Sequence, residues 1–64
     1  MGNKIKEYRK LKKLTQIELS EKSGVSRTII SGLESGRIAN TTADTLKKIA
    51  TALDTTIADI FFAA

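Results

Sequence analysis

The sequence predicts an all-α fold, a single domain over residues 1–64 built from five short helices. Apolar residues recur at helical spacing in several segments, and no segment alternates apolar and polar residues as a half-buried strand does. At two places a threonine before an apolar segment is followed three positions later by an acidic residue, which is the pattern of a capping box at a helix start. The chain has no proline, so helix ends must be read from caps and glycines.

The first two helices are expected over residues 3–13 and 15–23. Asn3 is the candidate N-cap of the first helix. Thr15 opens the second, because its hydroxyl can accept from the backbone N–H three residues on while the Glu18 side chain reaches back. Ile5 and Tyr8 are expected to face inward, and the other apolar residues along this part of the chain are Leu11, Leu14, Ile17 and Leu19.

The third helix is expected over residues 26–35. Gly24 suits the left-handed conformation that commonly follows a helix end, so a sharp turn is expected between the second and third helices. Ser26 is the candidate N-cap, and Gly36 offers the C-terminal stop. The apolar residues of this helix are Ile29, Ile30 and Leu33, which are expected to pack inward.

Two further helices are expected over residues 42–53 and 56–62. The preceding segment, RIANTT, has no apolar period and is expected to be a loop. Thr42 caps the first of these helices, and Thr56 with Asp59 repeats the capping-box pattern at the second. Their apolar residues are Leu46, Ile49, Ala50 and Leu53, followed by Ile57, Ile60, Phe61 and Phe62.

The residues that are absent exclude several classes of protein. The sequence has no Cys and no His, so a conventional zinc site, a disulfide and a histidine-dependent mechanism have no side chains to use. We therefore expect no metal, no cofactor, no small-molecule ligand and no enzymatic activity. No apolar run approaches the roughly 18 residues of a membrane span, and no signal peptide opens the chain, so a cytoplasmic protein without a membrane partner is expected.

The net charge of +4 is unevenly distributed. Residues 1–13 hold six lysines and arginines against Glu7 alone, whereas residues 38–64 hold two lysines against three aspartates. A basic end favours a polyanionic partner. The alternative is a lysine-rich helix face that serves solubility.

The two helices expected over 15–23 and 26–35 are joined by a Gly-centred turn of about three residues, which is the connection of a helix-turn-helix unit. Such a unit places its second helix in the major groove of DNA. On the side opposite the inward residues, four residues form a second stripe near the N-terminus of this helix: Arg27, Thr28, Ser31 and Gly32. The candidates for reading bases are the three with polar side chains, Arg27, Thr28 and Ser31.

Each of these side chains suits a particular contact. The Arg27 guanidinium can bond bidentately to a guanine edge, and its alternatives are a phosphate contact or no contact. Thr28 can touch a thymine methyl or a phosphate, and Ser31 can instead bond its own helix backbone. Ile29 is expected in the core, with a thymine methyl as its alternative partner.

The run LTQIELSEKSGVSRTIISGLESG resembles the helix-turn-helix of the Cro and lambda-repressor-like superfamily, also called the xenobiotic-response-element family of bacterial and phage regulators. The likeness extends from Ile5 to Phe62. It implies a five-helix DNA-binding domain. The positions that match the family pattern are Thr15, Gln16, Leu19, Ser20, Gly24, Val25, Ser26, Ile30, Ser31, Leu33, Glu34 and Gly36.

Further roles follow from helix ends and from the resemblance. Residues at or near helix N-termini and in the adjoining loop are expected to contact the DNA backbone: Thr15, Gln16, Ser26, Arg37, Asn40 and Thr42. The resemblance implies an ion pair between Arg9 and Glu34 that ties the first helix to the third. It also implies a homodimer formed through the last helix, with Ile57, Phe61 and Phe62 contributing.

The sequence departs from the family pattern at several turns. Lys13 and Asp54 stand where many members have glycine, and Thr41 stands where a proline is common. Gly32 stands where members often have a long polar side chain that reaches a base. Either the backbone approaches DNA more closely at Gly32, or this glycine serves helix packing.

The function expected from the sequence is a sequence-specific regulator of transcription that binds double-stranded DNA. Its simplest form is a repressor that binds a palindromic operator as a homodimer. The alternative is a protein-interaction module on the same fold, with weak or no specific DNA binding. A phage-type repressor, a controller of a restriction-modification system and an antitoxin-like autoregulator remain open as biological settings.

Overall fold

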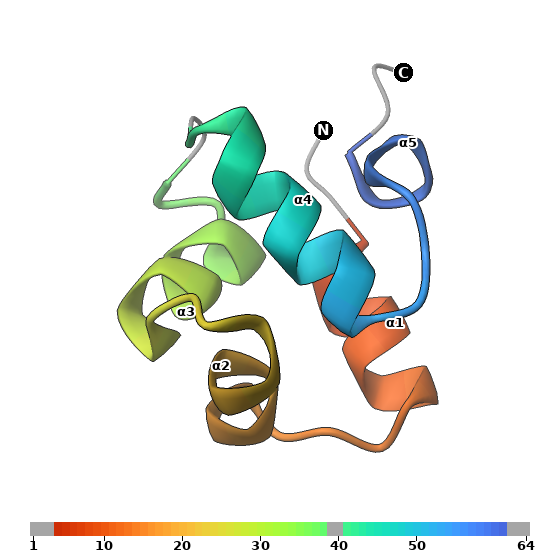
Figure 1. The fold of residues 1–64 in the computed structure, drawn as a ribbon. Coiled ribbons are helices and arrows are strands. Elements are labelled where there is room, and N and C mark those ends of the chain that lie inside the picture. Colours follow the sequence, from red (N-terminus) through yellow and green to blue (C-terminus); the bar gives the residue numbers. More distant parts are fainter. Residues whose placement is uncertain (1–3, 39–40, 62–64) are drawn as a thin grey trace.

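The computed structural model describes residues 4–38 and 41–61, and within these ranges every regular element is a helix. The prediction of an all-α fold with five helices is confirmed (Figure 1). The helices are α1 (Ile5–Leu11), α2 (Gln16–Ser23), α3 (Arg27–Ser35), α4 (Ala43–Ala52) and α5 (Ile57–Ile60).

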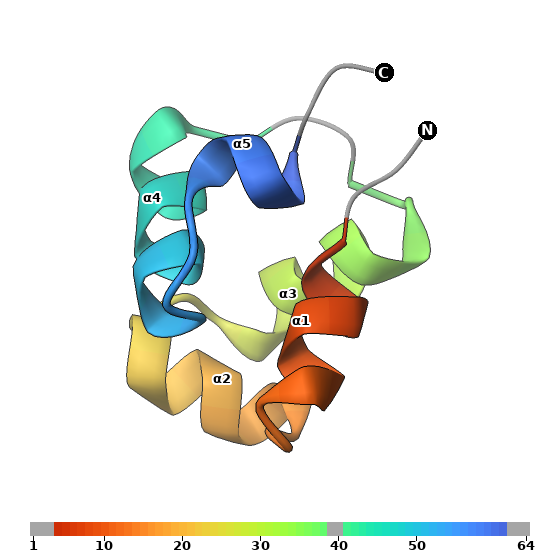
Figure 2. The same ribbon diagram turned by 90° about the vertical axis from the view of Figure 1, so that its right-hand side faces the viewer.

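The helices enclose one small core (Figures 1 and 2). α2 packs against both α3 and α4, while α1 packs against α3 and α5 packs against α4. The backbone N–H of Lys4 donates to the Ile60 carbonyl at 3.0 Å, so the start of α1 is joined to the end of α5. The residues that fill the core are Ile5, Leu19, Val25, Ile30, Leu33, Ile49, Ala50, Ala52, Leu53 and Ile60.

The threonine and serine caps are confirmed as the starts of four helices. At α2 the Glu18 N–H donates to Thr15 Oγ1 at 3.0 Å, and the Thr15 N–H donates to Glu18 Oε1 at 2.8 Å. Thr56 closes the same box with Asp59 at α5, and Ser26 and Thr42 cap α3 and α4. These bonds satisfy donors that a helix start leaves free.

The first helix differs from its prediction at both ends. It begins at Ile5 with Lys4 in the N-cap position and no side-chain cap, and it ends at Leu11, two residues earlier than expected. Asn3, the predicted cap, lies outside the described residues. At the end of the helix the Leu11 side chain is 75% exposed, although Ile5 is buried as expected.

Two turns place an ordinary side chain in the left-handed region. Gly24 and Gly36 end α2 and α3 at φ values of 77° and 85°, as predicted. Lys13 and Asp54 adopt φ values of 59° and 56°, at the positions where the resemblance leads one to expect glycine. A residue with a Cβ is strained there, because its Cβ crowds the following carbonyl oxygen.

An ion pair ties α1 to α3. Arg9 Nε donates to Glu34 Oε2 at 2.8 Å and Arg9 Nη2 donates to Glu34 Oε1 at 3.0 Å. The Arg9 and Glu34 side chains are only 11% and 6% exposed, so the pair expected from the resemblance is present and largely shielded from water. Arg9 Nη1 also donates to the Leu14 carbonyl at 2.8 Å, which holds the chain between α1 and α2.

The pair shifts the ionisation of both partners. Burial alone raises the pKa of Glu34, but the hydrogen bonds from Arg9 and Gln16 and the charge of Arg9 outweigh burial, so the pKa lies below its ordinary value. The hydrogen bond to Glu34 raises the pKa of Arg9. Both shifts favour the charged forms, so the fold is more stable with Glu34 ionised than with Glu34 protonated.

The strain at Lys13 predicts a stabilising substitution. Lys13→Gly removes the Cβ clash and adds chain entropy to the unfolded state, so we expect a net gain of about 0.5–1 kcal/mol in the free energy of unfolding. Urea denaturation followed by circular dichroism measures it. Lys13→Ala is the matched control, since it removes the same side chain beyond Cβ but keeps the Cβ at φ 59° and so keeps the strain. Equal stabilities of Lys13→Gly and Lys13→Ala would contradict the assignment of strain.

The shielded ion pair predicts a large loss of stability when only one partner is removed. Arg9→Ala leaves the Glu34 carboxylate buried without its partner, which should cost about 3 kcal/mol. Lys48→Ala is the control, because it breaks the exposed Asp44–Lys48 pair, whose side chains are 73% and 52% exposed, and should change stability little. Equal losses in the two variants would show that the Arg9–Glu34 pair behaves as a surface pair.

The same pair predicts a dependence on pH. Because the folded pKa of Glu34 is lowered, its contribution is complete above the ordinary glutamate pKa of 4.5 and is lost as the pH falls through the folded pKa. Asp59, whose pKa is lowered by hydrogen bonds from Thr55 and Thr56, acts in the same direction. The difference in unfolding free energy between the parent protein and Glu34→Gln therefore isolates Glu34, and it should shrink below pH 4.5. A constant difference would refute the linkage.

Candidate nucleic-acid interface

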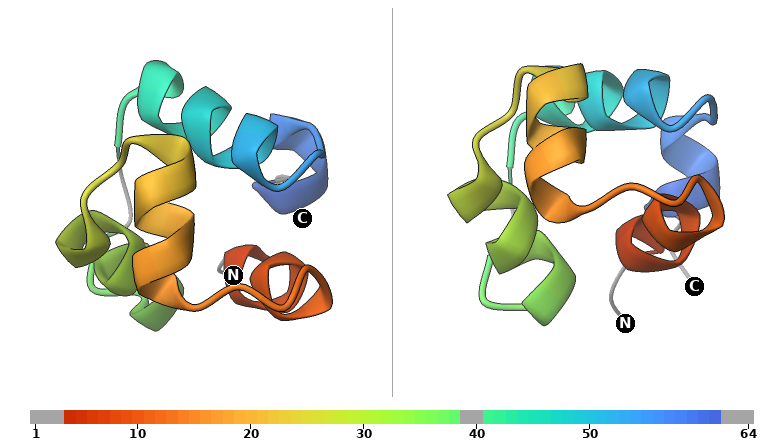
Figure 3. Two further views of the ribbon diagram at one scale, coloured as in Figure 1. Left: turned by 60° about the horizontal axis from the view of Figure 1, so that its bottom comes forward. Right: turned by 90° about the horizontal axis from the view of Figure 1, so that it is seen from below.

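The turn between α2 and α3 is built by four residues with separate tasks. Gly24 reverses the chain, and Val25 inserts its side chain into the core, where it is 6% exposed. The Ser23 hydroxyl accepts from the Val25 N–H at 3.2 Å, and Ser26 then caps α3 by accepting from the Ile29 N–H at 3.2 Å. Figure 3 shows the result in two views, with α3 set at an angle to α2 at one side of the molecule.

The two faces of α3 have opposite environments. Ile30 and Leu33 are 0% and 2% exposed and anchor the helix to the core. Arg27 and Thr28 are exposed at the N-terminal end, and Ser31 is half-exposed one turn later. The three candidates for base readout therefore occur together on the side of the helix turned away from the core, as their spacing predicts.

Gly32 is not exposed with this stripe, and of the two alternatives left open for it the structure supports helix packing. It is buried beneath the Ile38 side chain, and a Cβ added to Gly32 would lie 2.6 Å from Ile38 Cγ1. The Ile38 N–H donates to the Gly32 carbonyl at 3.0 Å, which fixes this close approach. Gly32 therefore serves packing between α3 and the segment that follows it.

The cap residues among the backbone candidates already make hydrogen bonds within the fold. The hydroxyls of Thr15, Ser26 and Thr42 each accept a backbone N–H at the start of their helix. A hydroxyl that accepts such a bond still carries one O–H donor, although Thr42 Oγ1 also shares a bond with Thr45 Oγ1 at 2.9 Å. Asn40 lies outside the described residues.

Gln16 stands at the first position of α2 and is half-buried. Its Nε2 donates to Glu34 Oε1 at 3.2 Å, so it joins the ion pair between α1 and α3. The sequence pattern predicted only a phosphate contact for Gln16 and gave no signal of this bond between two helices. One Nε2 hydrogen and the carbonyl oxygen of the amide remain for other partners.

Arg37 follows α3 and folds back along it. Arg37 Nε donates to Ser35 Oγ at 3.1 Å, and Arg37 Nη2 donates to Ser31 Oγ at 3.4 Å. The guanidinium, expected to contact the DNA backbone, thus lies beside a residue expected to read bases. Sequence spacing alone gave no signal of this contact.

The candidates for dimer contact lie at α5. Ile57 and Phe61 are half-buried and pack against the margin of the core, so each has both a structural contact and an accessible part. Phe62 lies outside the described residues.

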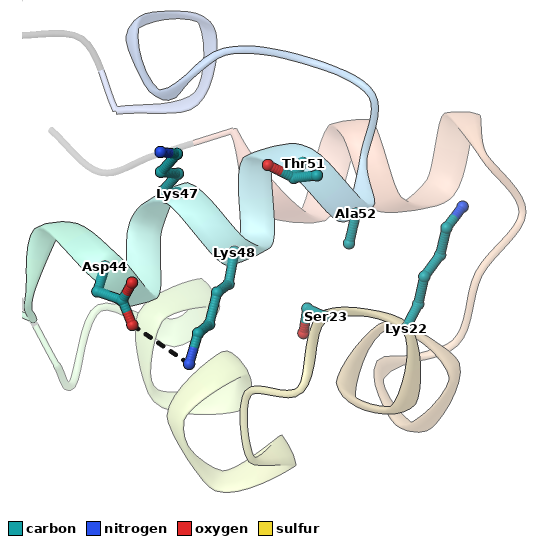
Figure 4. Close-up of a pocket in the computed structure, with 7 residues that line it drawn as sticks. All are labelled: Lys22, Ser23, Asp44, Lys47, Lys48, Thr51 and Ala52. Carbon is teal, nitrogen blue, oxygen red and sulfur yellow. Dashed lines mark ion pairs between the residues drawn. The ribbon is translucent and has the colours of Figure 1, made fainter.

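A shallow hollow lies between the end of α2 and the outer side of α4 (Figure 4). The Lys48 ammonium and the Asp44 carboxylate pair across part of it at 3.2 Å. Its lining residues are Lys22, Ser23, Asp44, Lys47, Lys48, Thr51 and Ala52. Among the described residues, no cluster of three or more His, Cys, Asp or Glu side chains is placed to hold a metal ion, and no helix has the length and apolarity to cross a membrane.

Comparison with known proteins places this geometry in a family. A family model described as helix-turn-helix, HTH_3, matches residues 5–60. The chain is 35% identical over 57 residues to the HTH-type transcriptional regulator SinR of Bacillus subtilis, covering 89% of this chain and 51% of SinR. It is 42% identical over 53 residues to the immunity repressor protein of Bacillus phage phi105, covering 83% of this chain and 36% of that protein.

A solved structure shares the fold. The SinR protein/SinI protein complex contains a chain that matches with a TM-score of 0.82 and 34% identity, over 86% of this chain and 53% of that chain. This chain thus spans about half the length of SinR, and 36% of the phage repressor. The family match over residues 5–60, together with a capped turn between α2 and α3, shows that the chain belongs to the helix-turn-helix family of the Cro and lambda-repressor-like, xenobiotic-response-element type.

Proposed function

We propose that this chain is the DNA-binding part of a transcriptional repressor that reads a palindromic operator as a homodimer. The observation that carries the proposal is the division of α3 into a buried face and a polar face. Ile30 and Leu33 fix the helix to the core, while Arg27, Thr28 and Ser31 remain accessible on the other side. A helix held in this way can enter the major groove without rearrangement.

Arg27 is the residue best suited to read a base. It is exposed in the first turn of α3, where base contacts of helix-turn-helix proteins concentrate. Its guanidinium can donate to O6 and N7 of guanine, which discriminates against other bases by roughly 1–3 kcal/mol. Thr28 and Ser31 supply a methyl group and hydroxyls for neighbouring base pairs.

The starts of α2, α3 and α4 are suited to hold the phosphate backbone. Each start carries backbone N–H groups and a positive helix end, which favour an anion. The hydroxyls of Thr15 and Ser26 add one donor each, Thr42 adds one when Thr45 is the donor of the bond that the two hydroxyls share, and Gln16 adds an amide hydrogen. These contacts would fix the position of α3 without selecting sequence.

The dimensions of the domain allow two copies to bind one site. Its longest extent is 27 Å, which is shorter than the roughly 34 Å between half-sites one DNA turn apart. Two copies related by a two-fold axis can therefore stand side by side on a palindrome. The accessible parts of Ile57 and Phe61 on α5 are the proposed contact.

A second candidate function is a protein-interaction module on the same fold. The matched SinR structure is a complex with SinI, so a related chain is known in contact with another protein. Loss of specific DNA binding would favour this alternative. The biological setting, whether phage repressor, restriction-modification controller or antitoxin-like autoregulator, does not change the contact chemistry proposed here.

Selection of bound sequences from a random duplex pool at about 150 mM salt tests the reading of bases. We expect the parent protein to enrich a palindrome that contains guanine in each half-site, and Arg27→Ala to lose that guanine preference, because the bidentate contact is gone. Lys10→Ala is the control, since it removes an equal, exposed charge on α1 and should keep the consensus. Failure of the parent protein to enrich any sequence would exclude the proposed function and favour the protein-interaction module.

The spacing of half-sites tests the homodimer. We expect two chains per selected palindrome by analytical ultracentrifugation. Insertion of five base pairs between the half-sites turns them to opposite faces of the duplex, so affinity should fall to that of one half-site. Ile57→Lys should weaken binding to the full palindrome while retaining binding to one half-site, with circular dichroism as the check on folding. One chain per palindrome, with no effect of the insertion, would rule out the dimer.

A further inference from the structure

We propose that Arg37 is a second base-reading residue, held in place by the hydroxyls of Ser31 and Ser35. This inference rests on the proposed function, and it changes the role that the sequence suggested for Arg37. The residue lies after the end of α3, where a contact to phosphate was expected. Its side chain instead lies along α3, with bonds to Ser35 Oγ at 3.1 Å and to Ser31 Oγ at 3.4 Å.

The backbone of Arg37 is fixed on both sides. Before it, Gly36 adopts φ 85° and reverses the chain at the end of α3. After it, the Ile38 N–H donates to the Gly32 carbonyl at 3.0 Å while the Ile38 side chain covers Gly32. A side chain at position 32 would occupy the space of Ile38, so the glycine permits this return of the chain toward α3.

The direction of the guanidinium is set by the Ser35 hydroxyl. Ser35 Oγ donates to the Gly32 carbonyl at 3.2 Å, so its proton is used and its lone pairs are left for donors. Those lone pairs accept the Arg37 side chain at 3.1 Å and the Arg37 backbone N–H at 3.4 Å. Ser35 is thus a positioning residue for Arg37.

The donors that remain on Arg37 suit a base edge. A guanidinium has five N–H groups, and the two bonds to Ser31 and Ser35 use two of them. The three that remain are both hydrogens of Nη1 and one of Nη2. One hydrogen of Nη1 and the hydrogen of Nη2 can form the forked pair that guanine O6 and N7 accept. Because the side chain is already ordered by the two serines, binding has less conformational freedom to remove.

Arg27 and Arg37 should read different base pairs. Ser31, against which Arg37 lies, is four residues after Arg27, which is a rise of about 6 Å along an α-helix. Successive base pairs are about 3.4 Å apart. The two arginines are thus separated by about one turn of α3, which is more than one base-pair step, so we expect each half-site to contain two guanine preferences at different base pairs.

Sequence selection with Arg37→Ala, Arg37→Lys, Arg27→Ala and the charge control Lys10→Ala tests the inference. We expect Arg37→Ala to lose a guanine preference at a base pair other than the one lost in Arg27→Ala, with roughly tenfold weaker binding to the parent consensus. Arg37→Lys should lose the same preference while keeping the salt dependence, because lysine retains the charge but lacks the fork. Ser35→Ala should weaken this preference with Arg37 still present.

The opposite result has a different signature. If Arg37 contacts only phosphate, Arg37→Ala weakens binding to all sequences alike, lowers the salt slope by about one and leaves the consensus unchanged, while Arg37→Lys restores binding. That outcome overturns the inference and leaves the proposed function standing. If the parent protein selects no consensus, the proposed function fails, and base reading by Arg37 fails with it.

Discussion

The position of α3 depends on a partly buried charge network that joins three helices. Arg9 on α1 and Gln16 on α2 both donate to the carboxylate of Glu34 near the end of α3. An ionised carboxylate whose side chain is only 6% exposed needs such partners, so the network opposes arrangements of the three helices that separate them. The apolar core of this chain is small, so packing alone orients the helices weakly. The hydrogen bonds to Glu34 add a constraint that depends on direction.

Tight packing around Gly32 provides a second constraint at the same helix. The Glu34 network holds α3 from the side of α1 and α2, whereas Ile38 closes over Gly32 from the loop that follows α3. Glycine weakens a helix interior by roughly 1 kcal/mol relative to alanine. The partial burial of Ile38 against the core opposes that cost, and the return of the chain also places Arg37 against Ser31 and Ser35. Gly32, the weakest helix former in α3, therefore allows the return of the chain that places Arg37 beside the polar face of the helix.

Local chemistry made most of the fold predictable from sequence. The caps at Thr15, Ser26, Thr42 and Thr56 depend only on residues within one helical turn, so their patterns identified four helix starts. The inward residues Ile30 and Leu33 followed from helical spacing. At α1 the local signals were weaker, since Lys4 makes no side-chain cap, and there the predicted bounds were two residues too long at each end.

The parts that sequence did not predict depend on contacts between segments. Burial of Gly32 requires Ile38 to return from six residues away, and periodicity within α3 contains no information on that return. The bond from Gln16 to Glu34 likewise spans two helices. The DNA contacts themselves remain predictions, because the pattern identifies which side chains are accessible but not which bases they meet.

The cap residues would link the stability of this domain to its proposed recognition of DNA. Thr15, Ser26 and Thr42 fix the helix starts, and the same helix starts provide the N–H groups proposed to face phosphate. Removing a cap costs about 1 kcal/mol of stability whether or not the hydroxyl touches DNA. A loss of binding in such a variant therefore has two physical sources. Arg27 is exposed, and the bonds of Arg37 to Ser31 and Ser35 are exposed as well, so changes at these two positions report more directly on the proposed recognition of DNA.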